Sequence, residues 1–216
     1  MAYLIKELKH NQQKLIKRSK KPLKKMLEVL ETLESSSDTT VYALDETGIS
    51  VESSNYLSWS PIGHPPILEK NASHTGVNVV GSTTILNNYH SVNDVYHSQH
   101  SITSEEIKTH IEHLLQINEG KKVVIFMDNA KTHTSRKMEK FYLDNRDRLT
   151  IILLPRYSPY MNPQENVWSF LKSKLFKPSA RGSIYELISD IKMIFDELNS
   201  DVEQLRSLAY ARSFLV

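Results

Sequence analysis

The sequence contains no cysteine in its 216 residues, which excludes disulfide bonds and thiolate metal sites. It also lacks any apolar run that approaches the length of a membrane span. Its first residues, MAYLIKELKHNQQK, contain no uninterrupted apolar core of the kind found in signal peptides. These absences favour an intracellular, cytoplasmic protein with no membrane partner.

The composition is that of an ordinary globular chain. Hydrophobic residues make up 39% of the sequence and charged residues 24%, which argues against wholesale disorder. A chain of this length suits one domain with a sizeable core plus some extra segments. The net charge of +2 says little, and the distribution of charge says more.

Residues 1–25 form a strongly basic arm with nine lysines and arginines against one acid, Glu7. Such an arm can neutralise DNA phosphates and release counterions. The residues that we expect to contact DNA here are Lys17, Arg18, Lys20 and Lys21. A solvated helix face or a flexible tether is the alternative interpretation of the same charges.

The polar run Ser35–Asp38 is typical of a linker. We therefore expect a basic arm and linker over residues 1–38, a main domain over residues 39–200, and a C-terminal tail over residues 201–216.

Five stretches have the β-branched, aromatic or apolar content of strands. They are residues 39–45, 75–86, 89–99, 123–127 and 149–154. The first should end near Asp45, with Gly48 turning the chain. The last two are continuous apolar runs, which are typical of strands buried on both faces.

Four helices are predicted between and after these strands, over residues 103–120, 137–145, 162–177 and 183–198. Thr103 with Glu106, and Ser183 with Glu186, have the spacing of capping boxes. Asn162 is the expected N-cap of the third helix. The order of elements predicts an α/β fold with a mixed five-stranded sheet flanked by helices.

Two acids directly follow predicted strands. Asp45 and Asp128 stand where ligands gather in open α/β sheets, outside the carboxyl ends of the strands. A charged residue at the end of an apolar strand is costly unless it is solvated or paired, and a metal ion would provide that pairing.

A third acid, Glu165, lies in the first turn of a predicted helix. By helical rotation it lies at the rim of the buried face, and Trp168 falls on the apolar arc as a core residue. An interaction with the helix dipole is the alternative role for Glu165. Three converging carboxylates would be tolerated if they bind hard divalent cations such as Mg²⁺.

Three blocks of the sequence carry these acids: LDETG at 44–48, MDNAKTH at 127–133, and LPRYSPYMNPQENVW at 154–168. Together they resemble the blocks of the IS630/Tc1/mariner transposases, and the third block is the most specific. The segment from Trp59 to Gly63 also resembles this family. The resemblance covers roughly residues 40–200, and the spacing of 36 residues between Asp128 and Glu165 (positions 129–164) resembles the bacterial branch.

The resemblance implies an RNase H-like fold and a catalytic, metal-binding triad of Asp45, Asp128 and Glu165. It implies two Mg²⁺ or Mn²⁺ ions and cut-and-paste transposition on double-stranded DNA, at transposon ends and at a target. A homodimer and a bacterial, nucleoid-associated location are expected on the same ground. Because no helix-turn-helix pair precedes the first block, we expect either a separately encoded recognition subunit or a truncated copy.

Three further residues of the blocks are candidates for DNA contacts. Asn129 and His133 can orient a metal-bound water or contact a phosphate, whereas a turn at Asn129 and a helix cap at His133 are equally good interpretations. Arg156 lies in the approach to Glu165 and can touch the DNA backbone. A rigid loop that only aims Glu165 is the alternative.

Seven of the nine histidines lie between His64 and His113. The pairs His97/His100 and His110/His113 have a spacing that suggests zinc, but no complete ligand set has a motif spacing. His110 and His113 are expected on a polar helix face, and we do not predict a zinc site.

Two other functions remain as alternatives. A non-catalytic DNA-binding remnant would use the basic arm without chemistry. A general RNase H-like nuclease would act on RNA–DNA hybrids, and the third block argues against it.

Overall fold

The computed structural model describes residues 36–52, 75–155, 158–177 and 179–209, together with residues 28, 30, 31, 33, 61–64 and 67. The basic arm and Arg156 lie outside these described residues, as do Trp59 and most of the segment around it.

Five strands form one mixed sheet in the order β3-β2-β1-β4-β5. Their bounds are Thr39–Ser50 for β1, Gly76–Thr84 for β2, Ser91–His97 for β3, Lys122–Met127 for β4 and Leu149–Leu153 for β5. β1 pairs antiparallel with β2 and β2 with β3, whereas β4 pairs parallel with both β1 and β5. The mixed five-stranded sheet predicted from the sequence is confirmed.

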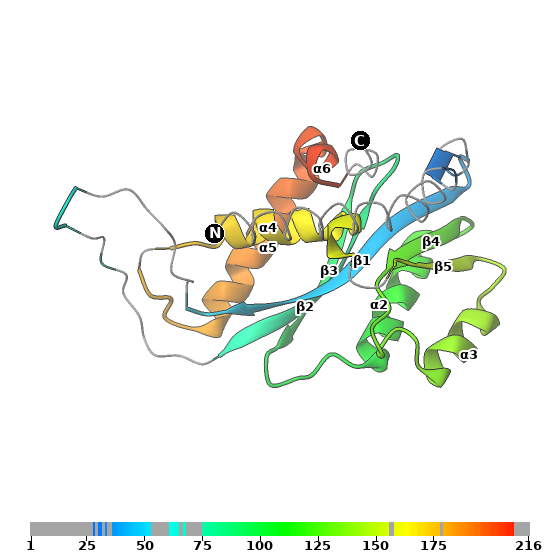
Figure 1. Cartoon of the computed structure of the whole chain (residues 1–216), viewed down its shortest axis with the longest axis horizontal. Helices are drawn as coiled ribbons and strands as arrows, with labels where there is room; N and C mark the ends of the chain where they lie inside the picture. The colour runs from blue at the N-terminus through cyan, green and yellow to red at the C-terminus, as the bar shows by residue number, and fades with distance from the viewer. Residues whose placement is uncertain are drawn as a thin grey trace, which may run out of the picture.

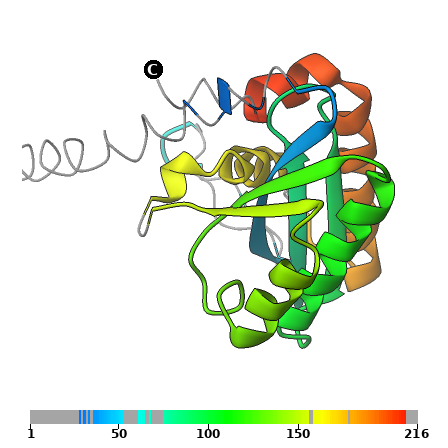
Figure 2. The same ribbon diagram turned by 90° about the vertical axis from the view of Figure 1, so that its right-hand side faces the viewer.

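Helices cover both faces of this sheet (Figure 1 and Figure 2). On one face, α2 (Ser104–Ile117) and α3 (Arg136–Asp144) bury Ile111 and Phe141 against Leu44 and Ile125 of the central strands. On the other face lie α4 (Gln164–Lys174), α5 (Ile184–Ser200) and α6 (Val202–Ala209). Burial of apolar side chains on both faces is the main source of stability in such a fold.

The alternation of side chains along β1 explains how one strand serves both layers. Tyr42 and Leu44 pack in the α2–α3 layer, whereas Val41 and Ala43 pack with Phe126 on the opposite face. In β4 every residue from Val123 to Met127 is buried, as its continuous apolar run predicts.

Local signals place the helix starts. Thr103 and Glu106 form the predicted capping box at α2. At α5, Ser183 accepts from the backbone N–H of Glu186 as predicted, but the Glu186 carboxylate accepts from Gly182, so the box is not reciprocal. At α4 the N-cap is Pro163 rather than the predicted Asn162, although Asn162 Oδ1 accepts from the backbone N–H of Gln164, the first residue of the helix, over 3.2 Å.

Several predicted boundaries are wrong. β1 does not end near Asp45 and Gly48 does not turn the chain, because antiparallel pairing with β2 continues to Ser50 opposite Gly76. The parallel pairing with β4 does end before Asp45, with Ala43 opposite Phe126. The third predicted helix, α4, ends at Lys174 rather than near residue 177.

The residues after position 200, expected as a tail, begin with α6. Its Leu205 and Ala209 are buried, and α6 packs against α4 and α5. The packed domain therefore continues past residue 200. None of the helices in the described part of the chain is long and apolar enough to cross a membrane.

Candidate active site

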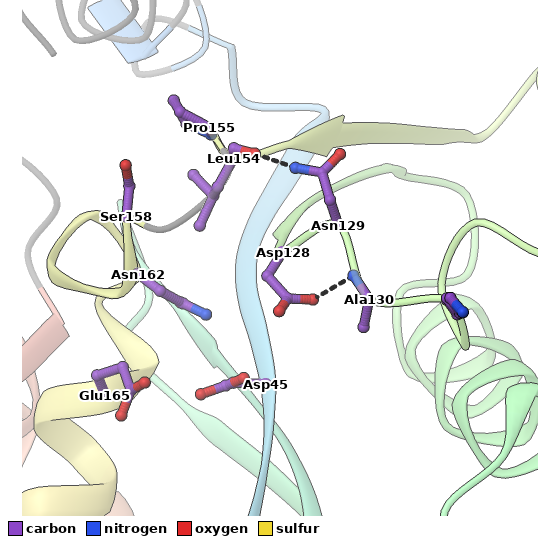
Figure 3. Close-up of a pocket in the computed structure, with 10 residues that line it drawn as sticks. Asp45, Asp128, Asn129, Ala130, Leu154, Pro155, Ser158, Asn162 and Glu165 are labelled. Atoms are coloured by element: carbon purple, nitrogen blue, oxygen red, sulfur yellow. Dashed lines mark hydrogen bonds between the residues drawn. The ribbon is translucent and has the colours of Figure 1, made fainter. Parts of the chain in front are cut away.

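A pocket of about 450 Å³ opens where β4 and β5 end beside the middle of β1. Asp45, Asp128 and Glu165 all line it, so the structure brings together three acids that lie far apart in the sequence. Figure 3 shows their carboxylates turned toward the same space. The remaining wall comes from the 128–131 loop, the end of β5 and the start of α4.

Each acid reaches the pocket from a different kind of element. Asp45 lies within β1, opposite Gly81 of β2. Asp128 is the first residue after β4, and its side chain is 58% exposed. Glu165 is an exposed residue in the first turn of α4. Asp128 and Glu165 thus lie at the strand end and the helix start predicted from the sequence, whereas Asp45 lies inside β1 rather than after it.

Burial and the repulsion among neighbouring acids together perturb Asp45 in the pocket. Burial raises the pKa of Asp45, and the nearby charges of Glu165, Glu46 and Asp128 raise it further, to about 7. The backbone N–H of Glu46 opposes this shift. A cation in the pocket would relieve the same repulsion.

Trp168 is buried, as predicted for a core residue, and its ring meets Phe195 edge-on. It has a second role that the sequence analysis missed. Its indole Nε1 donates a hydrogen bond to Oδ2 of Asp45 over 3.2 Å. The signal was its position three residues after Glu165, which places both side chains on neighbouring turns of one helix.

Gly81 makes room for this arrangement. A Cβ added there would lie 2.3 Å from Cη2 of Trp168 and 2.5 Å from Oδ1 of Asn93, far inside contact distance. A glycine is required at this point because the indole ring passes directly over the backbone of β2.

Asp128 is held by its own loop. Its Oδ1 accepts a hydrogen bond from the backbone N–H of Ala130 over 2.8 Å and lies 2.9 Å from Nδ1 of His133 (Figure 3 draws the first of these). His133 is fully buried, and its Nε2 lies 3.0 Å from Oε1 of Glu46. Burial lowers the pKa of His133, but the hydrogen bond and charge of Glu46 raise it overall, followed by the hydrogen bond to the backbone carbonyl of Asp128 and the charge of Asp128.

Two asparagines join the walls of the pocket to the sheet. Asn129 Nδ2 donates to the carbonyl oxygen of Leu154 at the end of β5. Asn162 Nδ2 donates over 3.1 Å to the carbonyl oxygen of Leu44, next to Asp45. The loop after β4 and the start of α4 are thereby tied to neighbouring strands.

The expected DNA contacts have different outcomes. Asn129 lines the pocket. His133 has no exposed surface, and both of its ring nitrogens face carboxylates, so this geometry does not offer it to a phosphate. It does not cap α3 either, because the cap is Ser135. Lys17, Arg18, Lys20, Lys21 and Arg156 lie outside the described residues.

One cation at the pocket was not singled out from the sequence. Lys131 lies in the loop after Asp128, lines the pocket and is exposed. Its place three residues after Asp128, within the second block, was the available signal. An exposed ammonium beside the acids is positioned to meet an anionic substrate.

The placement of His110 on a polar helix face is wrong. The side chain is fully buried between α2 and the sheet, with Nδ1 2.5 Å from Asp94 Oδ2 and Nε2 2.8 Å from Ser82 Oγ. Both ring nitrogens therefore have protein partners, which is how a buried histidine is satisfied. His113 is exposed, as expected.

The donor atoms of the pocket decide which kind of cation it can hold. Within the described ranges, no three histidine or acidic side chains already stand in an arrangement that could hold a metal ion. The donor set nevertheless suits a hard cation, because the three acids offer only oxygen ligands and repel one another without a counter-charge.

These observations define an α/β domain with a five-stranded mixed sheet in which three acids line one pocket. A sequence model of the DDE superfamily endonucleases matches residues 40–188, and the chain belongs to this family. A curated relative, "Uncharacterized protein y4pE/y4sA" of Sinorhizobium fredii (strain NBRC 101917 / NGR234), is 35% identical over 65 residues. That match covers 28% of this chain and 44% of the relative.

Solved structures show the same fold. The Mos1 transposase paired-end complex with left transposon end superposes with a TM-score of 0.68 at 15% identity, covering 91% of this chain and 59% of that chain. The catalytic domain of Mos1 mariner transposase gives 0.61 at 14% identity, covering 92% and 88%. The chain thus spans about 59% of the longer Mos1 chain. The expected RNase H-like fold is confirmed.

Proposed function

We propose that this chain is the catalytic domain of a DNA transposase, which cuts DNA at transposon ends and joins those ends to a target. The observation that carries the proposal is the convergence of Asp45, Asp128 and Glu165 on one pocket. Membership of the DDE superfamily endonucleases and the fold shared with Mos1 support the same conclusion.

In this proposal the three acids are the catalytic residues and the ligands of two Mg²⁺ or Mn²⁺ ions. Such ions, when bound, activate an attacking oxygen and stabilise the leaving one. Mos1 structures with Mn and with Mg bear on the choice of metal, although they concern that protein. No protein nucleophile is needed for this chemistry.

The chain's own contribution is to hold carboxylates and to receive DNA. The N–H groups of Trp168 and Ala130 hold one oxygen each of Asp45 and Asp128. The exposed ammonium of Lys131 at the same pocket would bind a phosphate of the scissile strand. Asn129 and Arg156 are further candidates for contacts with the DNA backbone.

The partners follow from the same proposal. Double-stranded DNA is the substrate, with the basic arm around Lys17, Arg18, Lys20 and Lys21 as an additional contact. A homodimer would hold two transposon ends, and a separately encoded helix-turn-helix subunit would read their sequence. A bacterial, nucleoid-associated location is the corresponding expectation.

The direct test is strand cleavage by the purified chain on duplex DNA that carries the ends of its element, with Mg²⁺ or Mn²⁺. We expect nicking and joining, and we expect Asp128→Asn to abolish both. Asp147→Asn, an exposed acid away from the pocket, is the matched control and should keep full activity. Full activity of Asp128→Asn would overturn the proposed mechanism.

A second assay addresses the basic arm and the non-catalytic alternative. Replacing Lys17, Arg18, Lys20 and Lys21 by alanine should lower the slope of log affinity against log salt by about 3–4, if each contacts a phosphate. Salt-dependent binding without any metal-dependent cleavage, with or without a recognition subunit, would favour the DNA-binding remnant. Preferential cleavage of RNA–DNA hybrids would favour a general nuclease.

A further inference from the structure

A buried imidazole stands between two carboxylates beside the pocket. His133 Nδ1 lies 2.9 Å from Oδ1 of Asp128, and His133 Nε2 lies 3.0 Å from Oε1 of Glu46. The Nε2–H of His133 donates to Glu46, whereas the Nδ1–H donates to the backbone carbonyl oxygen of Asp128 over 3.2 Å and lies within ion-pair distance of the Asp128 carboxylate. The three side chains form a continuous series, joined by a hydrogen bond at Glu46 and by an ion pair at Oδ1 of Asp128.

This series limits how Asp128 can turn. The backbone N–H of Ala130 donates to Oδ1, and Nδ1 of His133 forms an ion pair with the same oxygen. The other oxygen is left toward the pocket, on the side of Asp45 and Glu165 (Figure 3). Because Asp128 is 58% exposed and follows the last residue of β4, strand pairing does not fix its side chain.

The imidazole itself is held firmly. The backbone N–H of His133 donates to the carbonyl oxygen of Ala130, and the hydroxyl of Tyr142 donates to the carbonyl oxygen of His133 over 3.1 Å. The side chain has no exposed surface. A group held in this way can transmit a fixed orientation to its neighbour but cannot meet DNA or solvent.

Glu46 connects this series to the strand that carries Asp45. Adjacent residues on a strand point to opposite faces, so Asp45 faces the α4 layer and Glu46 faces the α2–α3 layer. β1 therefore supplies one acid to the pocket directly. It acts on a second acid through Glu46 and His133, around the end of β4.

We propose that His133, oriented by Glu46, is a positioning residue that fixes the metal-binding orientation of Asp128. The inference rests on the proposed function, since it assigns Asp128 to a divalent cation. Groups that hydrogen-bond to metal ligands orient them, and loss of such a group typically weakens metal affinity 10- to 100-fold. A purely structural His133 would matter for folding but not for the binding of an ion.

Replacing His133 by asparagine or by glutamine separates its contact with Asp128 from its contact with Glu46. The amide of His133→Asn stands near the place of Nδ1 and keeps a donor for Asp128. The amide of His133→Gln stands near Nε2 and keeps a donor for Glu46. Calorimetry and electron paramagnetic resonance measure Mn²⁺ binding to the full chain. Thermal unfolding measures the stability of each variant.

We expect His133→Gln to weaken Mn²⁺ binding 10- to 100-fold and His133→Asn to stay within about threefold of the unmodified chain. Affinity for DNA without metal should not change in either variant, because the imidazole is buried. Equal Mn²⁺ affinities for His133→Gln and the unmodified chain would overturn the inference. So would equal losses in both variants that track their loss of thermal stability.

Two more variants complete the test. Glu46→Gln keeps the size and an acceptor, so it is the variant to use if both histidine replacements fail to fold. Glu46→Gln should weaken Mn²⁺ binding severalfold. The control is Glu139→Gln, at an exposed position, which should leave Mn²⁺ binding unchanged. Equal effects of the two variants on Mn²⁺ binding would overturn the inference. Asp128→Asn separates the failure of the two proposals. If Asp128→Asn leaves Mn²⁺ binding unchanged, the proposed function fails. If Asp128→Asn weakens Mn²⁺ binding but the His133 and Glu46 variants do not, only the positioning role of His133 fails.

Discussion

The indole Nε1 of Trp168 on α4 donates a hydrogen bond to Oδ2 of Asp45 on β1, with 3.2 Å between the two atoms. The same helix presents Glu165 one turn earlier, so α4 supplies one acid of the pocket and holds another. A core tryptophan thereby joins the packing of the domain to the geometry of its candidate active site.

Replacing Trp168 by phenylalanine should preserve most of the packing and remove the donor. We expect about 1–2 kcal/mol of lost stability from the smaller ring and the lost hydrogen bond. We expect a roughly tenfold weaker affinity for Mn²⁺, because Asp45 loses its partner. Urea unfolding and calorimetry measure the two effects.

Phe195→Leu is the control for this variant, because Phe195 touches the Trp168 ring without reaching Asp45 through any described hydrogen bond. It should lower stability and leave Mn²⁺ affinity unchanged. If both variants weaken Mn²⁺ binding alike, the effect comes from packing and not from the indole N–H.

Gly81→Ala should be destabilising out of proportion to its size. The added Cβ would lie 2.3 Å from the Trp168 ring, which must shift and lose its bond to Asp45. Overpacking of this kind costs about 1–3 kcal/mol, and metal affinity should fall with it. Gly48→Ala in the same strand pair is the matched control, because its Cβ meets Asn78 Oδ1 at an ordinary 3.5 Å. Equal stability of the two variants would show that the crowding at Gly81 is absent.

The raised pKa of Asp45 predicts a pH dependence of stability in metal-free protein. The folded chain binds this proton more tightly than the unfolded chain, since the pKa rises from 3.8 to about 7. The free energy of unfolding should therefore fall as the pH rises from about 4 to about 7, and then level off.

Asp45→Asn removes this contribution. In EDTA the variant should be more stable than the unmodified chain at a pH well above 7, by roughly 4 kcal/mol, and the difference should shrink toward pH 4. Urea unfolding across this range checks the sign. A difference that is constant with pH would contradict the raised pKa.

Arg181 should stabilise the fold without taking part in the chemistry of the pocket. It is buried, donates to Asp190 over 2.9 Å and to the carbonyl oxygen of Val51 over 3.3 Å, and also donates to the carbonyl oxygen of Leu175. Arg181→Ala leaves these acceptors without their donor, and Lys177 compensates Asp190 only in part. We expect a loss of about 3 kcal/mol in thermal or urea unfolding.

Arg206→Ala provides the comparison, because Arg206 is 54% exposed and 3.9 Å from Glu203. Exposed pairs of this kind contribute about 0–1 kcal/mol. A loss for Arg181→Ala no larger than that for Arg206→Ala would mean that the buried contacts of Arg181 do not stabilise the fold.

The strands and the three acids could be predicted because their signals are local. The apolar run before Asp128 marks a buried strand, and Asn162 and Pro163 mark the helix start that carries Glu165. The extent of β1 could not be predicted, because its last residues are held by antiparallel pairing with β2, which is distant in sequence. Strand ends that depend on a partner are not encoded in their own composition.

The histidines illustrate a different limit. His110 falls between Ile107 and Leu114 on the apolar stripe of α2, and its burial was readable from that spacing. The error was to assume that a polar side chain faces solvent. His133 could not be placed, because its partner Glu46 is 87 residues earlier in the chain and meets it only in the folded sheet.

The pairing of Asp45 with Gly81 also has a consequence for chain length. Slipping β1 by one residue against β2 would exchange the faces of the whole strand, bringing Glu46 to the acidic side and burying Asp45 beneath α2. Inserting one residue ahead of Asp45 within the paired stretch would thus exchange the two faces of β1. Insertions in residues 53–74, between β1 and β2, leave the faces of β1 unchanged. Among relatives, gain and loss of residues should accordingly concentrate in that connection.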